Sequence, residues 1–156
     1  VQTCALPICW GDEATKAGRS AACGIASAML MRGSQKRNRE QLRNEFDRLK
    51  ASVGVGGDGA SIETVRDNLP HALQLVAEVL RQPAFPESEF EQLRNASLAS
   101  IESQRSAPSS LASLELSRYL NPYPAEHWLY SASIDERIAR LKSISVADVR
   151  RCHEDF

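Results

Sequence analysis

The chain has 156 residues, of which 42% are hydrophobic and 25% charged, and its formal net charge is −1. This is the composition of an ordinary globular protein with enough residues for one core. The near-neutral charge excludes a general binder of nucleic acids or anionic membranes, which needs a basic excess. No apolar run approaches the roughly 18 to 20 residues of a membrane span.

Both ends of the sequence are atypical. No methionine opens the chain, and residues 1–8 resemble the translation of a sequencing-library adaptor. We therefore set these residues aside and expect native sequence from residue 9 or 10. Residues 9–156 are expected to form one incomplete domain, truncated at both ends.

The four cysteines are too few for a disulfide-rich scaffold in a chain of this length. Cys4 lies in the segment set aside, and Cys9 lies at its border. Cys23 and Cys152 remain as an isolated pair, from which we infer no redox compartment.

The first third of the chain is predicted to be mainly helical. Trp10–Glu13 is interpreted as the end of a strand. Residues 18–32 are rich in Ala, Met and Leu, which indicates a buried helix that ends near Gly33. Asn38 followed by Gln41 is a capping-box pattern, and it predicts the start of a second helix.

A glycine-rich stretch then changes the periodicity. Residues 52–56 and 60–66 flank Gly57-Asp58-Gly59, which predicts a hairpin, because Asp-Gly suits turns that need positive φ. Residues 54–59 also match the Gly-x-Gly-x-x-Gly string of dinucleotide sites. That motif requires a strand before it and a helix after it, whereas here a helix precedes it, so the hairpin is favoured.

The remainder is predicted to be helical, with breaks at prolines. One helix runs from Asn68 to before Pro83, and a longer one from Pro86 to Pro108. Three more follow, over residues 109–120 and after the capping boxes that begin at Ser133 and Ser145. We therefore expect an α+β fold in which helices, including both long ones, pack on one face of a mainly antiparallel sheet.

The residues alone indicate no active site. His71, His127 and His153 have no Cys, His, Asp or Glu partner at metal-ligand spacing. No Gly-x-Ser-x-Gly nucleophile motif occurs either.

Several short sequence segments nevertheless occur in the same order, and at the same spacing, as in the members of a known protein family. They are Met29–Ser34, Arg39–Leu42, Phe46–Ser52, Asn68–Leu80, Pro83–Pro86 with Glu89-Phe90, Asn121–Pro124 and Val146–Val149. Together they resemble the pitrilysin/insulinase family of zinc metallopeptidases, the inverzincins. The resemblance implies a LuxS/pitrilysin-like sandwich of helices on a sheet.

Active domains of that family carry His-x-x-Glu-His on the first helix, where two histidines bind zinc and the glutamate activates water. In register, Gly24 and Ala28 stand at the histidine positions and Ser27 at the glutamate position. The third zinc ligand falls near Ser100. The resemblance therefore implies no catalytic, cofactor-binding or metal-binding residue in this chain, and it predicts that Gly24, Ala28 and Ser100 lie close together.

This pattern resembles the non-catalytic half of the family, in its C-terminal part. The resemblance implies a domain that helps to form a clamshell-shaped peptide chamber opposite a zinc-bearing half, which is part of the same chain or a separate subunit. Zn²⁺ is expected in that half, and peptides as substrates. The alternative is a scaffold subunit without peptidase function in a larger complex. Because long bacterial members are often exported, a periplasmic or otherwise extracytoplasmic location is expected.

Overall fold

A computed structural model describes residues 2–7, 19–56, 59–125, 127 and 129–155. Trp10–Glu13 and the predicted turn residues Gly57 and Asp58 lie outside these ranges. The expected α+β class is confirmed. The elements in chain order are β1 (Gln2–Pro7), α2 (Ser20–Met29), η1 (Leu30–Arg32), α3 (Arg39–Arg48), β2 (Ser52–Val55), β3 (Gly59–Thr64), η2 (Arg66–Asn68), α4 (Leu69–Arg81), α5 (Glu87–Ser103), η3 (Gln104–Ser106), α6 (Pro108–Leu120), α7 (Ile134–Ser143) and α8 (Val146–Glu154).

The described strands form one antiparallel sheet in the order β1-β3-β2. The predicted hairpin is confirmed, because β2 pairs with β3 in a register that places Val53 opposite Ile62. Along β3, buried and exposed residues alternate, as expected for a strand with one face against a core. Ala60, Ile62 and Thr64 are the buried members.

Strand β1 was not expected. It is formed by residues that the sequence analysis set aside, and it pairs with β3 from Gln2 opposite Thr64 to Pro7 opposite Gly59. The hairpin alone would leave β3 at an edge, and β1 makes it the central strand. The origin of residues 1–8 stays a prediction, because backbone pairing does not depend on it.

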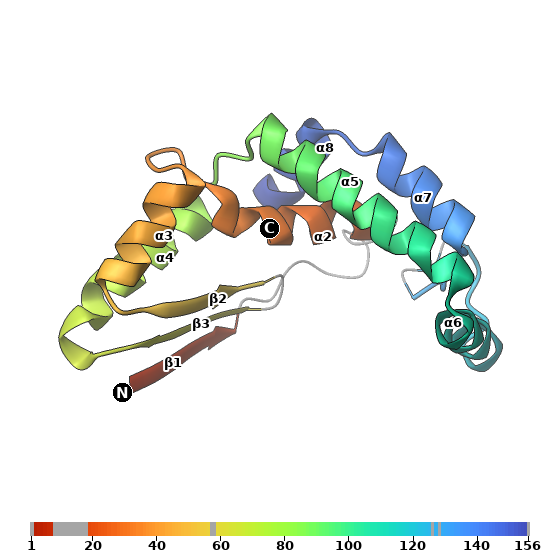
Figure 1. Cartoon of the computed structure of the whole chain (residues 1–156), viewed down its shortest axis with the longest axis horizontal. Coiled ribbons are helices and arrows are strands. Elements are labelled where there is room, and N and C mark those ends of the chain that lie inside the picture. Colours follow the sequence, from red (N-terminus) through yellow and green to blue (C-terminus); the bar gives the residue numbers. More distant parts are fainter. Residues whose placement is uncertain (1, 8–18, 57–58, 126, 128, 156) are drawn as a thin grey trace.

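The helices divide into two groups along the molecule (Figure 1). Helices α3 and α4 lie against β2 and β3. Helix α5 instead runs away from the sheet and packs on α2 and α7. The expectation that both long helices cross the sheet is therefore right for α4 and wrong for α5. The physical reason is that the chain turns between Pro83 and Pro86, so that Phe90 enters the core while the rest of α5 faces other helices.

Four helix ends lie where short sequence patterns predict them. Helix α2 continues into η1 and ends at Gly33, whose φ of 145° favours glycine. Reciprocal capping boxes begin α3, α7 and α8, as predicted. Their residue pairs are Asn38 with Gln41, Ser133 with Glu136, and Ser145 with Asp148.

A disulfide joins α2 to α8. Its cysteines are Cys23 and Cys152, whose Cα atoms are 5.5 Å apart although the residues are separated by 129 positions. Cys152 is fully buried in the hydrophobic core. The sequence alone indicated no bond between these two cysteines, and the structure shows that they pair. The positions of the two cysteines in the sequence do not predict this disulfide, because it depends on how two helices that are distant in the sequence pack together.

Candidate functional site

A pocket of about 800 Å³ lies between α2 and α5, and α7 closes one side. We call it the α2–α5 pocket. The structure brings three of the four predicted motif positions to its wall: Gly24 and Ala28 from α2, and Ser100 from α5. The fourth, Ser27, is half-buried and does not line the pocket. The further lining residues used below are Ile25, Leu93, Ile101, Gln104, Leu114, Tyr130, Arg137, Arg140 and Leu141.

Small residues keep the pocket open. Gly24 and Ala28 are one helical turn apart and share a face of α2. A Cβ atom placed on Gly24 would meet no other atom within 4 Å. Opposite them, α5 contributes Ala96, Ser97 and Ser100. The volume that larger side chains would fill is therefore accessible.

The pocket does not fit a zinc ion. Zinc in proteins is held by thiolates, imidazoles and carboxylates. The lining contains no His, Asp or Glu and no free thiol. Across all the residues that the structure describes, no group of three or more His, Cys, Asp or Glu residues could hold a metal. It stays a prediction that the zinc-ligand and general-base positions of the family are occupied in this chain by Gly24, Ser27, Ala28 and Ser100.

The pocket instead carries two cations that the sequence analysis did not single out. Arg137 and Arg140 lie on α7, three residues apart and therefore on neighbouring positions of one helix face. The Nη1 atom of Arg137 donates a hydrogen bond of 2.8 Å to Oε1 of Gln104. The guanidinium carbon of Arg140 lies 5.7 Å from the centre of the Tyr130 ring. Both charged groups are thus held in place by neighbouring side chains.

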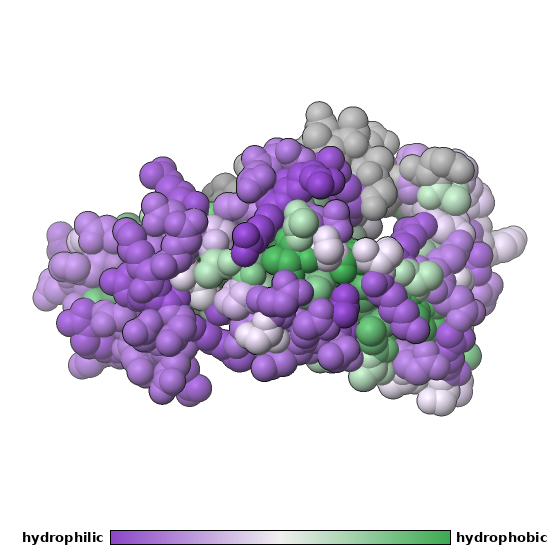
Figure 2. All heavy atoms as spheres, turned by 90° about the horizontal axis from the view of Figure 1, so that it is seen from above, coloured by the Kyte–Doolittle hydropathy of each residue, from purple (hydrophilic) through white to green (hydrophobic). Residues whose placement is uncertain are grey.

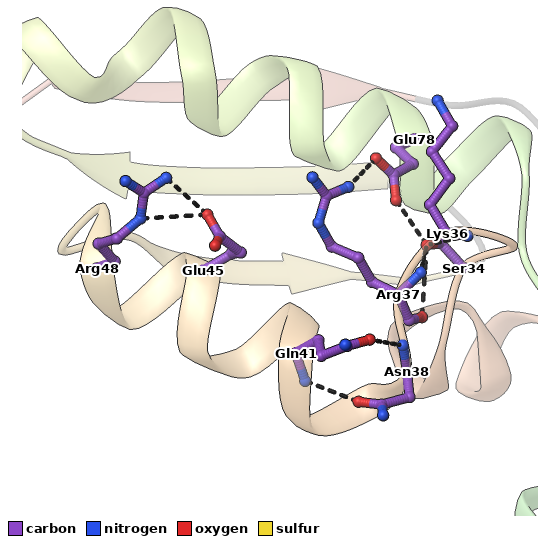
Figure 3. Close-up of polar contacts among 8 residues, drawn as sticks. All are labelled: Ser34, Lys36, Arg37, Asn38, Gln41, Glu45, Arg48 and Glu78. Carbon is purple, nitrogen blue, oxygen red and sulfur yellow. Dashed lines mark hydrogen bonds and ion pairs between the residues drawn. The ribbon is translucent and has the colours of Figure 1, made fainter.

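A second polar cluster fixes the loop between η1 and α3 (Figure 3). Glu78, on α4, accepts a hydrogen bond of 2.6 Å from Ser34 Oγ, and Arg37 forms an ion pair with its other carboxylate oxygen. Burial disfavours the charge of Glu78, but the hydrogen bonds from Ser34 and Arg37 and the charges of Arg37 and Lys36 outweigh it and lower its pKa. Glu78, which the sequence offered only as the acidic residue of the rejected dinucleotide motif, anchors this loop.

Replacing Glu78 with glutamine should therefore destabilise the fold by about 1–2 kcal/mol at pH 7. Since the pKa of Glu78 is lower in the folded state, its contribution is present above the unfolded value of about 4.3 and is lost as pH falls through the folded value. Urea unfolding of both proteins at pH 7 and pH 3 measures this. The matched control is Glu45→Gln, whose exposed pair with Arg48 should contribute below about 0.5 kcal/mol. A difference independent of pH would contradict the assignment.

Comparison with known proteins gives structural matches only. No family model and no curated protein matches the chain by sequence. The crystal structure of a peptidase M16 inactive domain from Pseudomonas fluorescens matches with a TM-score of 0.77 and 26% identity, covering 97% of this chain and 37% of that one. The chain resembles an inactive domain of the peptidase M16 family. M16 is the pitrilysin/insulinase family, so the predicted resemblance is confirmed.

Two further structures share the fold of this M16-like domain. A conserved protein from Enterococcus faecalis matches with a TM-score of 0.68 and 18% identity, covering 97% of this chain and 39% of that one. A protease from Helicobacter pylori matches with a TM-score of 0.66 and 15% identity, covering 88% of this chain and 33% of that one. The chain thus spans between a third and two fifths of the length of these structures.

The outer surface of the M16-like domain is unevenly polar. On the face drawn in Figure 2, hydrophilic side chains cover the end that carries α3 and α4, and apolar residues gather in the middle and toward the opposite end. The exposed large apolar residues include Leu116, Tyr119 and Leu120 on α6. Among the described residues, no helix is both long and apolar enough to cross a membrane.

Proposed function

We propose that this chain forms one wall of the peptide chamber of a zinc metalloendopeptidase and takes no part in the chemical step. The observation that carries the proposal is the α2–α5 pocket. It lies where the family's active domains are expected to hold zinc, yet its lining offers no zinc ligand. The likeness to an inactive M16 domain supports a non-catalytic role.

In this proposal a second, homologous half binds Zn²⁺ and supplies the general base. The chain corresponds to one domain of the C-terminal, inactive half, and the zinc-bearing half is part of the same protein or a separate subunit. The two halves enclose the peptide between them. Support comes from the likeness to an inactive M16 domain, because a peptidase with an inactive domain needs a catalytic one elsewhere.

We also propose an extracytoplasmic location. The disulfide between Cys23 and Cys152 supports it, because structural disulfides persist in oxidising compartments and are rare in the bacterial cytosol. The disulfide supports this compartment independently of the family resemblance.

The test of the proposed function is zinc content and peptidase activity of the purified chain. After incubation with ZnCl₂ and dialysis, we expect less than about 0.1 zinc per chain, because the pocket lacks ligands. We also expect no cleavage of a quenched fluorescent peptide. Stoichiometric zinc, or hydrolysis by the chain alone, would overturn the proposal.

A zinc site introduced by mutation tests the alignment with the family's zinc ligands, on which the proposed function rests. The triple variant Gly24→His/Ala28→His/Ser100→Glu should bind zinc with a Kd of about 1 μM or tighter, because it restores two imidazoles and a carboxylate to one pocket. The matched control places histidines one turn apart on α3, as Arg43→His/Asp47→His, without a carboxylate from α5. The control should bind zinc at least about tenfold more weakly. Equal affinities would show that the three positions do not converge.

A further inference from the structure

The α2–α5 pocket combines an apolar interior with a cationic rim. Its lining contains two arginines and no carboxylate. Arg137 is half-buried and Arg140 is exposed, so that one charge lies within the pocket and the other at its border with solvent. In the part of the chain that the structure describes, neither guanidinium forms an ion pair.

The carboxylates of α7 hydrogen-bond to partners other than Arg137 and Arg140. Glu136 accepts a hydrogen bond of 2.7 Å from the backbone N–H of Ser133, and the Tyr130 hydroxyl donates to both of its oxygens at 3.2 Å. Asp135 pairs with Arg105, and neither residue lines the pocket. The charge of Arg140 also lowers the pKa of Glu136, so Arg137 is the cation whose charge no neighbouring carboxylate on α7 offsets, and the lining itself contains no carboxylate.

The interior of the pocket is suited to an apolar side chain. Ile25 and Leu141 are buried, and Leu93, Ile101 and Leu114 are half-buried beside the open volume. A volume of about 800 Å³ is within the range of pockets that bind small ligands and peptide side chains. Because apolar walls exclude water, a charge interaction at the rim is screened less there than on an open surface.

We propose that the α2–α5 pocket binds a peptide segment in which an apolar side chain is followed by a carboxylate. The apolar side chain fills the space beside Gly24 and Ala28, and the carboxylate pairs with Arg137 and Arg140. Charge complementarity selects this occupant: a lysine or arginine at the same place on the peptide would meet two like charges. The inference rests on the proposed function, for which it names the class of peptide.

The experiment is a binding measurement with two fluorescein-labelled peptides that differ in one residue. Both carry a leucine between glycines; the first has glutamate after it and the second has lysine. Fluorescence anisotropy with the 156-residue chain should show at least about tenfold tighter binding of the glutamate peptide at low salt. The preference should shrink as the salt concentration rises.

Three variants connect this binding to the pocket. Ala28→Trp fills the space beside α5 and should abolish binding of both peptides. Arg137→Gln/Arg140→Gln removes both positive charges but keeps polar side chains, and it should reduce the preference for glutamate to less than about twofold. Arg43→Gln/Arg48→Gln, on α3 and outside the pocket, is the matched control and should keep the preference. Circular dichroism verifies that each variant is folded.

Equal binding of the two peptides, or binding that survives Ala28→Trp, overturns the proposal. So does an absence of binding at millimolar peptide, the result expected if another part of a longer protein covers the pocket. None of these outcomes changes the zinc content or the peptidase activity of the chain. The failure of this inference is therefore distinguishable from the failure of the proposed function.

Discussion

Replacing Cys23 and Cys152 with serine should lower the free energy of unfolding by about 4 kcal/mol. The disulfide closes a loop of 129 positions, and the entropy that a cross-link removes from the unfolded chain grows with loop length. The serine hydroxyl at position 152 adds a cost, because Cys152 lies in the core. Urea unfolding followed by circular dichroism measures the change.

The reduced protein provides the control. Dithiothreitol should lower the unfolding midpoint of the parent chain to near that of the double variant and leave the variant itself unchanged. Peptide mapping without reduction should recover a fragment that links Cys23 to Cys152. If reduction leaves the midpoint of the parent unaffected, the disulfide does not hold α8 onto α2 in solution.

Truncation of Phe90 to alanine should cost about 3–5 kcal/mol. Phe90 is 1% exposed and is the only residue of α5 that is buried. The Arg94 guanidinium lies 5.2 Å from the centre of its ring. Loss of the ring leaves a cavity at the point where α5 meets the core, so the wall of the α2–α5 pocket loses its anchor. Thermal and urea unfolding measure the loss of stability.

The matched control for Phe90→Ala is Leu116→Ala on α6. Leu116 is 57% exposed, and its truncation should change stability by less than about 0.5 kcal/mol. A cost for Phe90→Ala below about 1 kcal/mol would show that α5 is held by its contacts with α2 and α7 rather than by this ring.

Features that depend on neighbouring residues were predictable from the sequence. A capping box is complete within four residues, so the starts of α3, α7 and α8 follow from pairs such as Ser133 and Glu136. The hairpin likewise depends on a short glycine-rich segment between β2 and β3. The sequence also correctly predicts a helix between Asn68 and Pro83, whose buried residues are Ala72, Leu75, Val76 and Val79.

Features that depend on distant residues were not predictable. The direction of α5 is decided by packing on α2 and α7, which its weak apolar stripe does not encode. The disulfide requires α2 and α8 to be adjacent, and β1 was missed because its residues were set aside. In the candidate site, the family resemblance identified Gly24, Ala28 and Ser100, but Arg137 and Arg140 join them only through tertiary packing.

The disulfide can form only late in the synthesis of the chain. Cys23 emerges from the ribosome 129 residues before Cys152. At roughly 5–20 residues per second, the first cysteine waits about 6–26 s for its partner. During that time α2 has no α8 to pack against. The cross-link can therefore form only after almost the whole described chain is present, so an oxidised molecule is one in which the last helix has already docked.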